Sequence, residues 1–180
     1  LHLCNKNMEK MDANNYNSDK AKHDLLLDVC MAAKYEGQSI KHYSEKYDAT
    51  YPGSGSTMCT MLARSFADIG DIVRGKDLFL GHKQGKQKLE ESLKTMFQNI
   101  QNENNNKLRR LSIEEVREYW WALNRQDVWK AITCGTHGGD TYFRTTCSDD
   151  RGGAQAKDKC RCPKGDQVPT YFDYVPQYLR

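Results

Sequence analysis

The chain of 180 residues is long enough to bury a core of its own, although its 38% hydrophobic residues lie below the usual share of a soluble globular domain. Its formal net charge of only +3 gives no whole-molecule reason to expect nucleic-acid binding. No apolar run approaches the ~20 residues that span a bilayer, and no signal-peptide pattern opens the chain. Because the chain starts at Leu1 rather than at a methionine, we expect a fragment of a longer protein whose anchor or export signal lies elsewhere.

Residues 1–17 are polar and rich in asparagine, which predicts a loop. A first helix is expected from the favourable N-cap residues 17–19 to about Tyr47. Gly37 inside this helix predicts close packing or a bend. The apolar positions recur at steps of three, four or seven residues and are Leu26, Val29, Ala33, Ile40, Tyr43 and Tyr47.

The Gly- and Ser-rich segment 51–56 ends that helix, and a second helix is expected from about Thr57 to Arg74, closed by Gly75. Its expected inward residues are Met61, Leu62, Phe66, Ile69, Ile72 and Val73. A third helix is expected from Lys86 to Asn102. Its expected inward residues are Leu89, Leu93, Met96, Phe97 and Ile100.

The Asn- and Gln-rich segment 98–106 is of low complexity and is expected to be a mobile linker. Ser112 and Glu115 have the spacing of a capping box, which predicts that a fourth helix begins here and ends at Cys134-Gly135. Its apolar residues are Val116, Tyr119, Trp120, Leu123, Val128 and Ile132. Four such helices joined by loops predict a mainly α fold, a four-helix bundle with a disulfide-braced Cys-rich loop.

Seven cysteines are the clearest compositional signal. Four of them lie in the polar stretch 134–165, which is typical of a disulfide framework in an oxidising compartment. We expect Cys4 to be unpaired and the other six to form three bridges, with Cys30–Cys59 as one pair. The bridged set is Cys30, Cys59, Cys134, Cys147, Cys160 and Cys162. A zinc site from the last four cysteines and His137 is the weaker alternative, because only Cys160 and Cys162 are closely spaced.

No sequence pattern indicates an enzyme. The chain lacks HExxH, GxSxG, P-loop, GxGxxG and paired-carboxylate motifs, and its five histidines are scattered. We therefore predict no catalytic residue, no cofactor and no metal.

The pair Trp120-Trp121 is expected on the fourth helix, where the two side chains point about 100° apart. The apolar stripe through Val116 and Leu123 predicts that Trp120 is in the core and that Trp121 lies nearer the rim.

Basic residues form three groups whose density suits sulfated sugars or phosphates, although any one group could be an ordinary charged surface. Between residues 83 and 110 there are seven basic and three acidic residues, a net +4. The candidate glycan-binding residues are Lys83, Lys86 and Lys88, then Lys107, Arg109 and Arg110, and finally Lys157, Lys159, Arg161 and Lys164. The first two groups flank the third helix, so they are expected at its opposite ends, roughly 25 Å apart at 1.5 Å per residue.

Several segments resemble the alpha-class Duffy-binding-like domain, the N-terminal adhesive module of the malaria parasite's variant erythrocyte membrane protein. The strongest are "ARSFADIGDIVRGKDLF" at 63–79, "REYWWALNRQDVWKAITC" at 117–134, "KCRC" at 159–162 and "VPTYFDYVPQYLR" at 168–180. "LHLCNKN" at 1–7 and "DLLLDVCMAAKYEGQSI" at 24–40 resemble the stretch just upstream. The resemblance covers nearly the whole chain in the family's order.

The resemblance implies that residues 1–17 end a first subdomain, that residues 18–165 form the middle helical one with its Cys-rich loop at 134–165, and that residues 166–180 begin a truncated next element. It also implies exposure on the infected red cell, anchored elsewhere in the parent protein, with antigenic variation and recognition by host antibodies. The expected partners are erythrocyte receptors bound in rosetting, either a sulfated glycosaminoglycan or blood-group glycan or a glycoprotein, and the rest of the parent adhesion protein.

Two rival hypotheses stay open at this point. One makes this chain a structural scaffold, with receptor binding carried by the missing subdomains. The other is a zinc-dependent intracellular nucleic-acid binder, which would require free thiols and which the Cys spacing disfavours.

Overall fold

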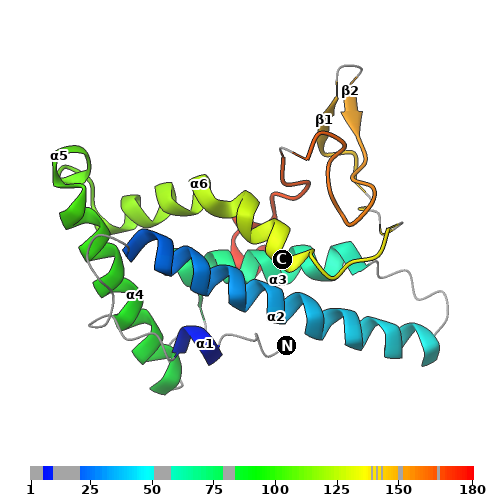
Figure 1. The fold of residues 1–180 in the computed structure, drawn as a ribbon, viewed down its shortest axis with the longest axis horizontal. Coiled ribbons are helices and arrows are strands. Elements are labelled where there is room, and N and C mark those ends of the chain that lie inside the picture. The colour runs from blue at the N-terminus through cyan, green and yellow to red at the C-terminus, as the bar shows by residue number, and fades with distance from the viewer. Residues whose placement is uncertain are drawn as a thin grey trace.

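A computed structural model describes residues 6–9, 21–50, 58–78, 84–138, 140, 142, 144–149, 152–165 and 167–180. Three long helices, α2 (Ala21–Thr50), α3 (Met58–Arg74) and α6 (Ile113–Ile132), pack along one another. The fourth, α4 (Gln84–Glu103), crosses one end of this layer, with the short helices α1 (Lys6–Glu9) and α5 (Asn105–Leu108) at its two ends (Figure 1). The mainly helical fold that the sequence predicts is therefore confirmed.

The helix boundaries follow from local sequence signals. Gly75 has φ of +73° and ends α3, because a residue without Cβ adopts this left-handed conformation without strain. At the start of α6 the Glu115 N–H donates to the Ser112 hydroxyl at 3.2 Å, and the Ser112 N–H donates to the Glu115 carboxylate at 2.7 Å. The predicted capping box is thus confirmed. The loop predicted for residues 1–17 contains the one-turn helix α1, whose Met8 is buried in the core.

The prediction of a mobile linker at 98–106 is wrong. Helix α4 continues to Glu103, and α5 follows almost at once. The amide side chains explain the difference, because they add hydrogen bonds that tie the end of α4 to α5 and to the turn after it. Gln101 donates to the carbonyls of Leu108 and Leu111, at 3.2 and 2.7 Å, and Asn104 donates to the Ile100 carbonyl at 3.0 Å.

Helices α2 and α6 meet closely at Gly37. A Cβ placed on this glycine would lie 2.0 Å from the Ile132 carbonyl oxygen, so no larger residue fits without separating the helices. Val29, Ala33 and Ile40 are buried as predicted, whereas Tyr43 is 62% exposed and lies outside the core. Close packing is therefore the role of Gly37.

The predicted orientation of α6 is only partly right: Val116, Trp120, Val128 and Ile132 are in the core as predicted, but Trp121 is not at the rim. Trp121 is fully buried, and Trp120, also buried, keeps 6% of its surface exposed. Tyr119 and Leu123, which were expected to face inward, are 58% and 81% exposed. The periodicity of α6 is ambiguous because apolar residues occupy two of its faces. The inner face, which contacts α3 through Phe66, carries Trp121, Val128, Trp129 and Ile132.

Buried charge fixes the inner face of α6 against the C-terminal segment, which forms the short 3-10 helices η3 (Phe172–Tyr174) and η4 (Gln177–Leu179). The Asp173 carboxylate is fully buried and accepts from Trp121 Nε1 at 2.9 Å and from Arg125 Nε and Nη2 at 2.8 Å each. Arg74 of α3 donates to the Asp173 backbone oxygen. The sequence prediction that residues 166–180 begin a separate element stays a prediction, but here they pack on α3 and α6.

A second buried arginine joins three helices. Arg117 of α6 donates to the last carbonyls of α3, those of Val73 at 2.6 Å and Ile72 at 3.0 Å. Its guanidinium also makes a bidentate pair with Glu90 of α4, at 2.7 and 3.0 Å. One side chain thus caps α3 and positions α4.

The predicted disulfide pairing is only partly right. Cys59 bonds Cys160, not Cys30, and Cys147 bonds Cys162. The first bridge joins α3 to the Cys-rich loop, which contains the antiparallel strands β1 (Cys147–Asp149) and β2 (Gly152–Ala154). Cys30 and Cys134, predicted to be bridged, are free thiols, and Cys4 lies outside the described residues. Cys30 is close enough to Asp127 of α6 to feel its charge, and Cys59 is already bonded to Cys160, so the two cysteines do not pair.

The Gly37 contact predicts a stability effect. We expect Gly37→Ala to destabilise the fold by about 1–3 kcal/mol, because the new methyl group meets backbone that cannot yield locally. Gly135→Ala is the matched control, since nothing lies within 4 Å of its Cβ position, and we expect a change of roughly 0.5 kcal/mol or less. Urea unfolding measures both variants, and equal effects would mean that α2 and α6 do not meet at Gly37.

The two free thiols predict different reactivities. Burial, with a further contribution from the Asp127 carboxylate, raises the pKa of Cys30 to about 11. At pH 8 roughly one Cys30 thiol in a thousand is then ionised, and only the thiolate is nucleophilic. We expect iodoacetamide to alkylate the exposed Cys134 first and Cys30 far more slowly, as read by peptide mass spectrometry of the unreduced protein. Labelling of both at the same rate would contradict this placement of Cys30.

Candidate functional site

The first predicted basic group lies at the start of α4. Lys83 falls outside the described residues. Lys86 lies 3.4 Å from the Asp77 carboxylate, so part of its charge is already neutralised within the protein. Lys88 is exposed. This end of α4 therefore offers a weaker anionic-ligand site than the sequence density predicts.

The second group forms the clearest basic surface, which we call the α5 cluster and define as Lys107, Arg109 and Arg110. All three residues are exposed. Together with Asn105 and Asn106 they line a hollow of about 460 Å³. The hydrogen bonds from Gln101 hold this turn on the end of α4, so the three cations are presented by a defined backbone.

The third group lies on the Cys-rich loop, at the opposite end of the molecule from α5 (Figure 1). Lys157, Lys159 and Lys164 are exposed. Arg161 is half-buried and donates to the Lys130 carbonyl at 3.2 Å and the Thr133 hydroxyl at 3.4 Å, so it caps the end of α6. The structure therefore places the predicted glycan-binding residues in three separate places rather than in one patch.

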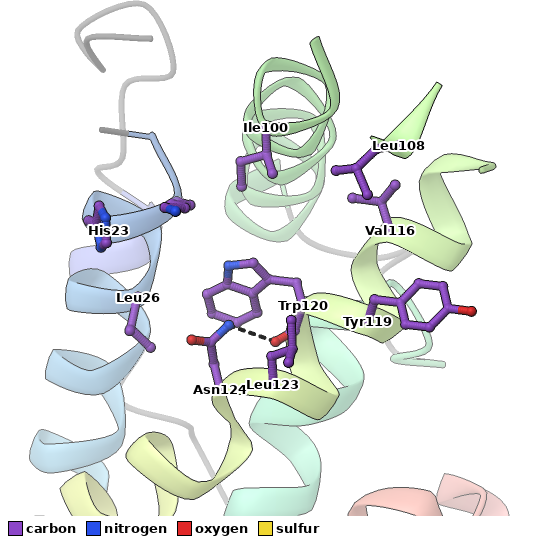
Figure 2. Close-up of a pocket in the computed structure, with 10 residues that line it drawn as sticks. His23, Leu26, Ile100, Leu108, Val116, Tyr119, Trp120, Leu123 and Asn124 are labelled. Atoms are coloured by element: carbon purple, nitrogen blue, oxygen red, sulfur yellow. Dashed lines mark hydrogen bonds between the residues drawn. The ribbon is translucent and has the colours of Figure 1, made fainter. Parts of the chain in front are cut away.

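Beside the α5 cluster lies an apolar groove of about 330 Å³, which the sequence analysis did not predict. Figure 2 shows the Trp120 indole in its middle, with His23 and Leu26 of α2 on one side and Ile100 of α4 on another. The Tyr119 ring extends outward from the edge of the groove (Figure 2). The lining residues are Lys22, His23, Leu26, Ile100, Leu108, Val116, Tyr119, Trp120, Leu123 and Asn124.

The groove has few polar groups to offer a ligand. The Asn124 amide nitrogen donates to the Trp120 backbone carbonyl at 2.7 Å, within the same helix. The Trp120 ring packs edge-to-face on Phe97, with centroids 5.9 Å apart, so the floor is continuous with the core. The sequence carries a signal for this groove, because the stripe Val116, Tyr119, Trp120 and Leu123 starts in the core at Val116 and Trp120 and reaches the surface at Tyr119 and Leu123.

Metal binding and membrane insertion find no support within the described parts of the chain. No three histidine, cysteine, aspartate or glutamate side chains gather there as a possible metal site. Helices in the same parts lack the length and apolar character needed to cross a bilayer. Partial burial of Asp68 and burial of Asp71 raise the pKa of both carboxyl groups, but both face Arg180, and Asp71 also pairs with Arg74. These acids therefore hold the C-terminal segment in place.

Comparison with known proteins places the chain in a single family. The model of the Duffy binding domain matches residues 1–180. A search of curated proteins finds no match.

Three solved structures similar to this chain are domains of PfEMP1 proteins of Plasmodium falciparum. The ICAM-1-binding DBLβ domain of the IT4var13 variant is 28% identical, with a TM-score of 0.73 over 99% of this chain and 39% of that chain. The DBLβ domain of another PfEMP1, bound to human ICAM-1, is 28% identical with a TM-score of 0.69, covering 99% and 36%. The IT4var13 domain bound to ICAM-1 is 27% identical with a TM-score of 0.65, covering 99% and 40%. This chain thus spans about two fifths of those chains.

Proposed function

Because the chain belongs to the Duffy binding domain family, we propose that it is part of a receptor-binding adhesion module of a variant surface protein on the infected red cell. Duffy-binding-like domains are adhesion modules and not enzymes. Two of the similar PfEMP1 structures contain a host glycoprotein, ICAM-1, which supports a host receptor as the partner of this chain. Antigenic variation and recognition by host antibodies belong to the same proposal.

The α5 cluster is the surface of this chain that best fits a sulfated or otherwise anionic receptor glycan. Its three cations project from one short turn, and they share a hollow with the amides of Asn105 and Asn106. Guanidinium groups form bidentate, charge-assisted hydrogen bonds with sulfate-like oxygens, while amides can bond hydroxyl groups. Binding of uninfected red cells through such a glycan is the specific form of adhesion that this surface supports.

The scaffold hypothesis is the second candidate, and one observation favours it. Several charged residues in the segments that resemble the family are used inside the fold. Arg74, Arg117 and Asp173 are all buried and bonded to other elements of the chain. These segments therefore identify the architecture, and a receptor could be bound by other parts of the full domain.

Heparin binding tests the α5 cluster. The triple variant Lys107→Glu, Arg109→Glu and Arg110→Glu should weaken binding at least about tenfold, because each lost charge-assisted bond contributes on the order of 1.5–3 kcal/mol. On a heparin column this variant should elute at clearly lower salt than the wild type. Binding should also weaken with salt in both proteins, since exposed charges are screened over about 8 Å at physiological ionic strength.

The charge-matched control reverses Lys157, Lys159 and Lys164 on the Cys-rich loop. We expect a much smaller shift in elution salt for this variant. Equal shifts in elution salt for the two variants would show that heparin binding depends on overall charge and not on the α5 cluster. No binding by the wild-type chain, together with binding by the full parent domain, would favour the scaffold hypothesis.

A further inference from the structure

A second face of α6 is apolar and only partly covered: Val116 and Trp120 are buried, whereas Tyr119 and Leu123 are exposed. The inner face of α6 is buried against α3, and this second stripe of Val116, Tyr119, Trp120 and Leu123 lines the groove. Leu123 is 81% exposed and Tyr119 is 58% exposed, although both lie in the middle of a well-formed helix. Single exposed apolar residues are normal, but a continuous apolar groove built from several helices marks an interaction site.

The chemistry of the groove favours apolar side chains over a sugar as the occupant. A sugar ring needs several polar partners for its hydroxyl groups, and burying such groups unpaired is costly. The floor offers Ile100, Val116 and the Trp120 indole, and the Asn124 amide nitrogen is already bonded to a backbone carbonyl. The α5 cluster next to it has the opposite character, so the two surfaces fit different ligand chemistries.

The rim of the groove carries positive charge. The Lys22 ammonium group lies on the α2 side, and Leu108 on the other side is flanked along the chain by the exposed cations Lys107 and Arg109. No carboxylate lines the groove among the residues that the structure describes. A partner with acidic side chains around its apolar ones would be attracted to this rim, whereas a basic partner would be repelled.

We propose that the groove binds an amphipathic helix of a protein partner, in which apolar anchor residues are flanked by aspartate or glutamate. Helices commonly dock in grooves between other helices through anchors at positions i, i+3 or i+4, and i+7. The volume of about 330 Å³ falls at the lower end of the range of ligand sites, which suits a few side chains rather than a whole ligand molecule. This protein-binding site is separate from the hollow proposed for a glycan at α5, although its rim charge includes Lys107 and Arg109 of the α5 cluster.

The probe for this site is a synthetic helical peptide with leucines at i, i+4 and i+7 and glutamates beside them, titrated into the ¹⁵N-labelled 180-residue chain. The NMR chemical shifts of backbone amides in α2, α5 and α6 around the groove should change and reach saturation as peptide is added. Leu123→Glu should weaken this binding about tenfold or more, because it removes an apolar contact and repels the peptide. A version of the peptide with lysines in place of the glutamates should bind clearly less well.

Leu27→Glu is the matched control, since Leu27 is 63% exposed on α2 and does not line the groove. Circular dichroism should show both variants folded, and heparin elution of Leu123→Glu should change no more than that of Leu27→Glu. Equal binding of both peptides, or equal loss in both variants, would overturn the proposal. So would a wild-type dimer that Leu123→Glu dissociates, which would make a second copy the occupant, or a full parent domain that covers Leu123 and leaves no site for the peptide.

Discussion

The buried carboxylate of Asp173 is the constraint on which the arrangement of the other elements depends. A carboxylate without solvent is tolerated only when hydrogen bonds and an opposite charge surround it. Trp121 and Arg125 of α6 provide these partners, while Arg74 of α3 holds the neighbouring backbone oxygen. The C-terminal segment therefore joins α3 to α6 long after both helices have ended in the sequence. It also fixes how α6 is rotated, because Trp121 must point toward Asp173.

That rotation decides which surfaces the chain presents. With Trp121 inward, the stripe that includes Trp120 and Leu123 turns toward the groove between α2, α4 and α5. Arg117, on the same helix, caps α3 and pairs with Glu90 of α4, so the corner that carries the α5 cluster is held by the same helix. The two proposed sites, the α5 cluster for an anionic ligand and the groove for an apolar protein segment, are therefore adjacent but chemically different. The buried charges define the scaffold, and both proposed binding surfaces use exposed residues of α5 and α6.

The sequence predicted the four long helices, the capping box at Ser112, the end of α3 at Gly75 and the family, because these depend on local signals. It failed where the outcome depends on contacts between distant residues. The full burial of Trp121 does not follow from the local pattern, because two apolar faces of α6 compete and the contacts of Trp121 with Phe66 and with Asp173, about fifty residues away, join distant parts of the chain. The Cys30–Cys59 bridge was wrong because spacing along the chain does not show which way a helix faces, and Cys59 meets Cys160 instead. The composition of the Asn-rich segment predicts a mobile linker because it does not show that Gln101 bonds the carbonyls of Leu108 and Leu111 and so ties α4 to α5.

The most direct measurement is the unfolding free energy of Asp173→Asn in urea, compared with Asp158→Asn on the exposed Cys-rich loop. Asparagine keeps the shape of the side chain but removes the charge that Arg125 pairs with. If the ionised carboxylate organises α3, α6 and the C-terminal segment, Asp173→Asn should lose about 3–5 kcal/mol, as when one partner of a buried ion pair is removed. Asp158→Asn should change by roughly 0.5 kcal/mol or less. A loss at Asp173 no larger than that at Asp158 would contradict the central role of this carboxylate.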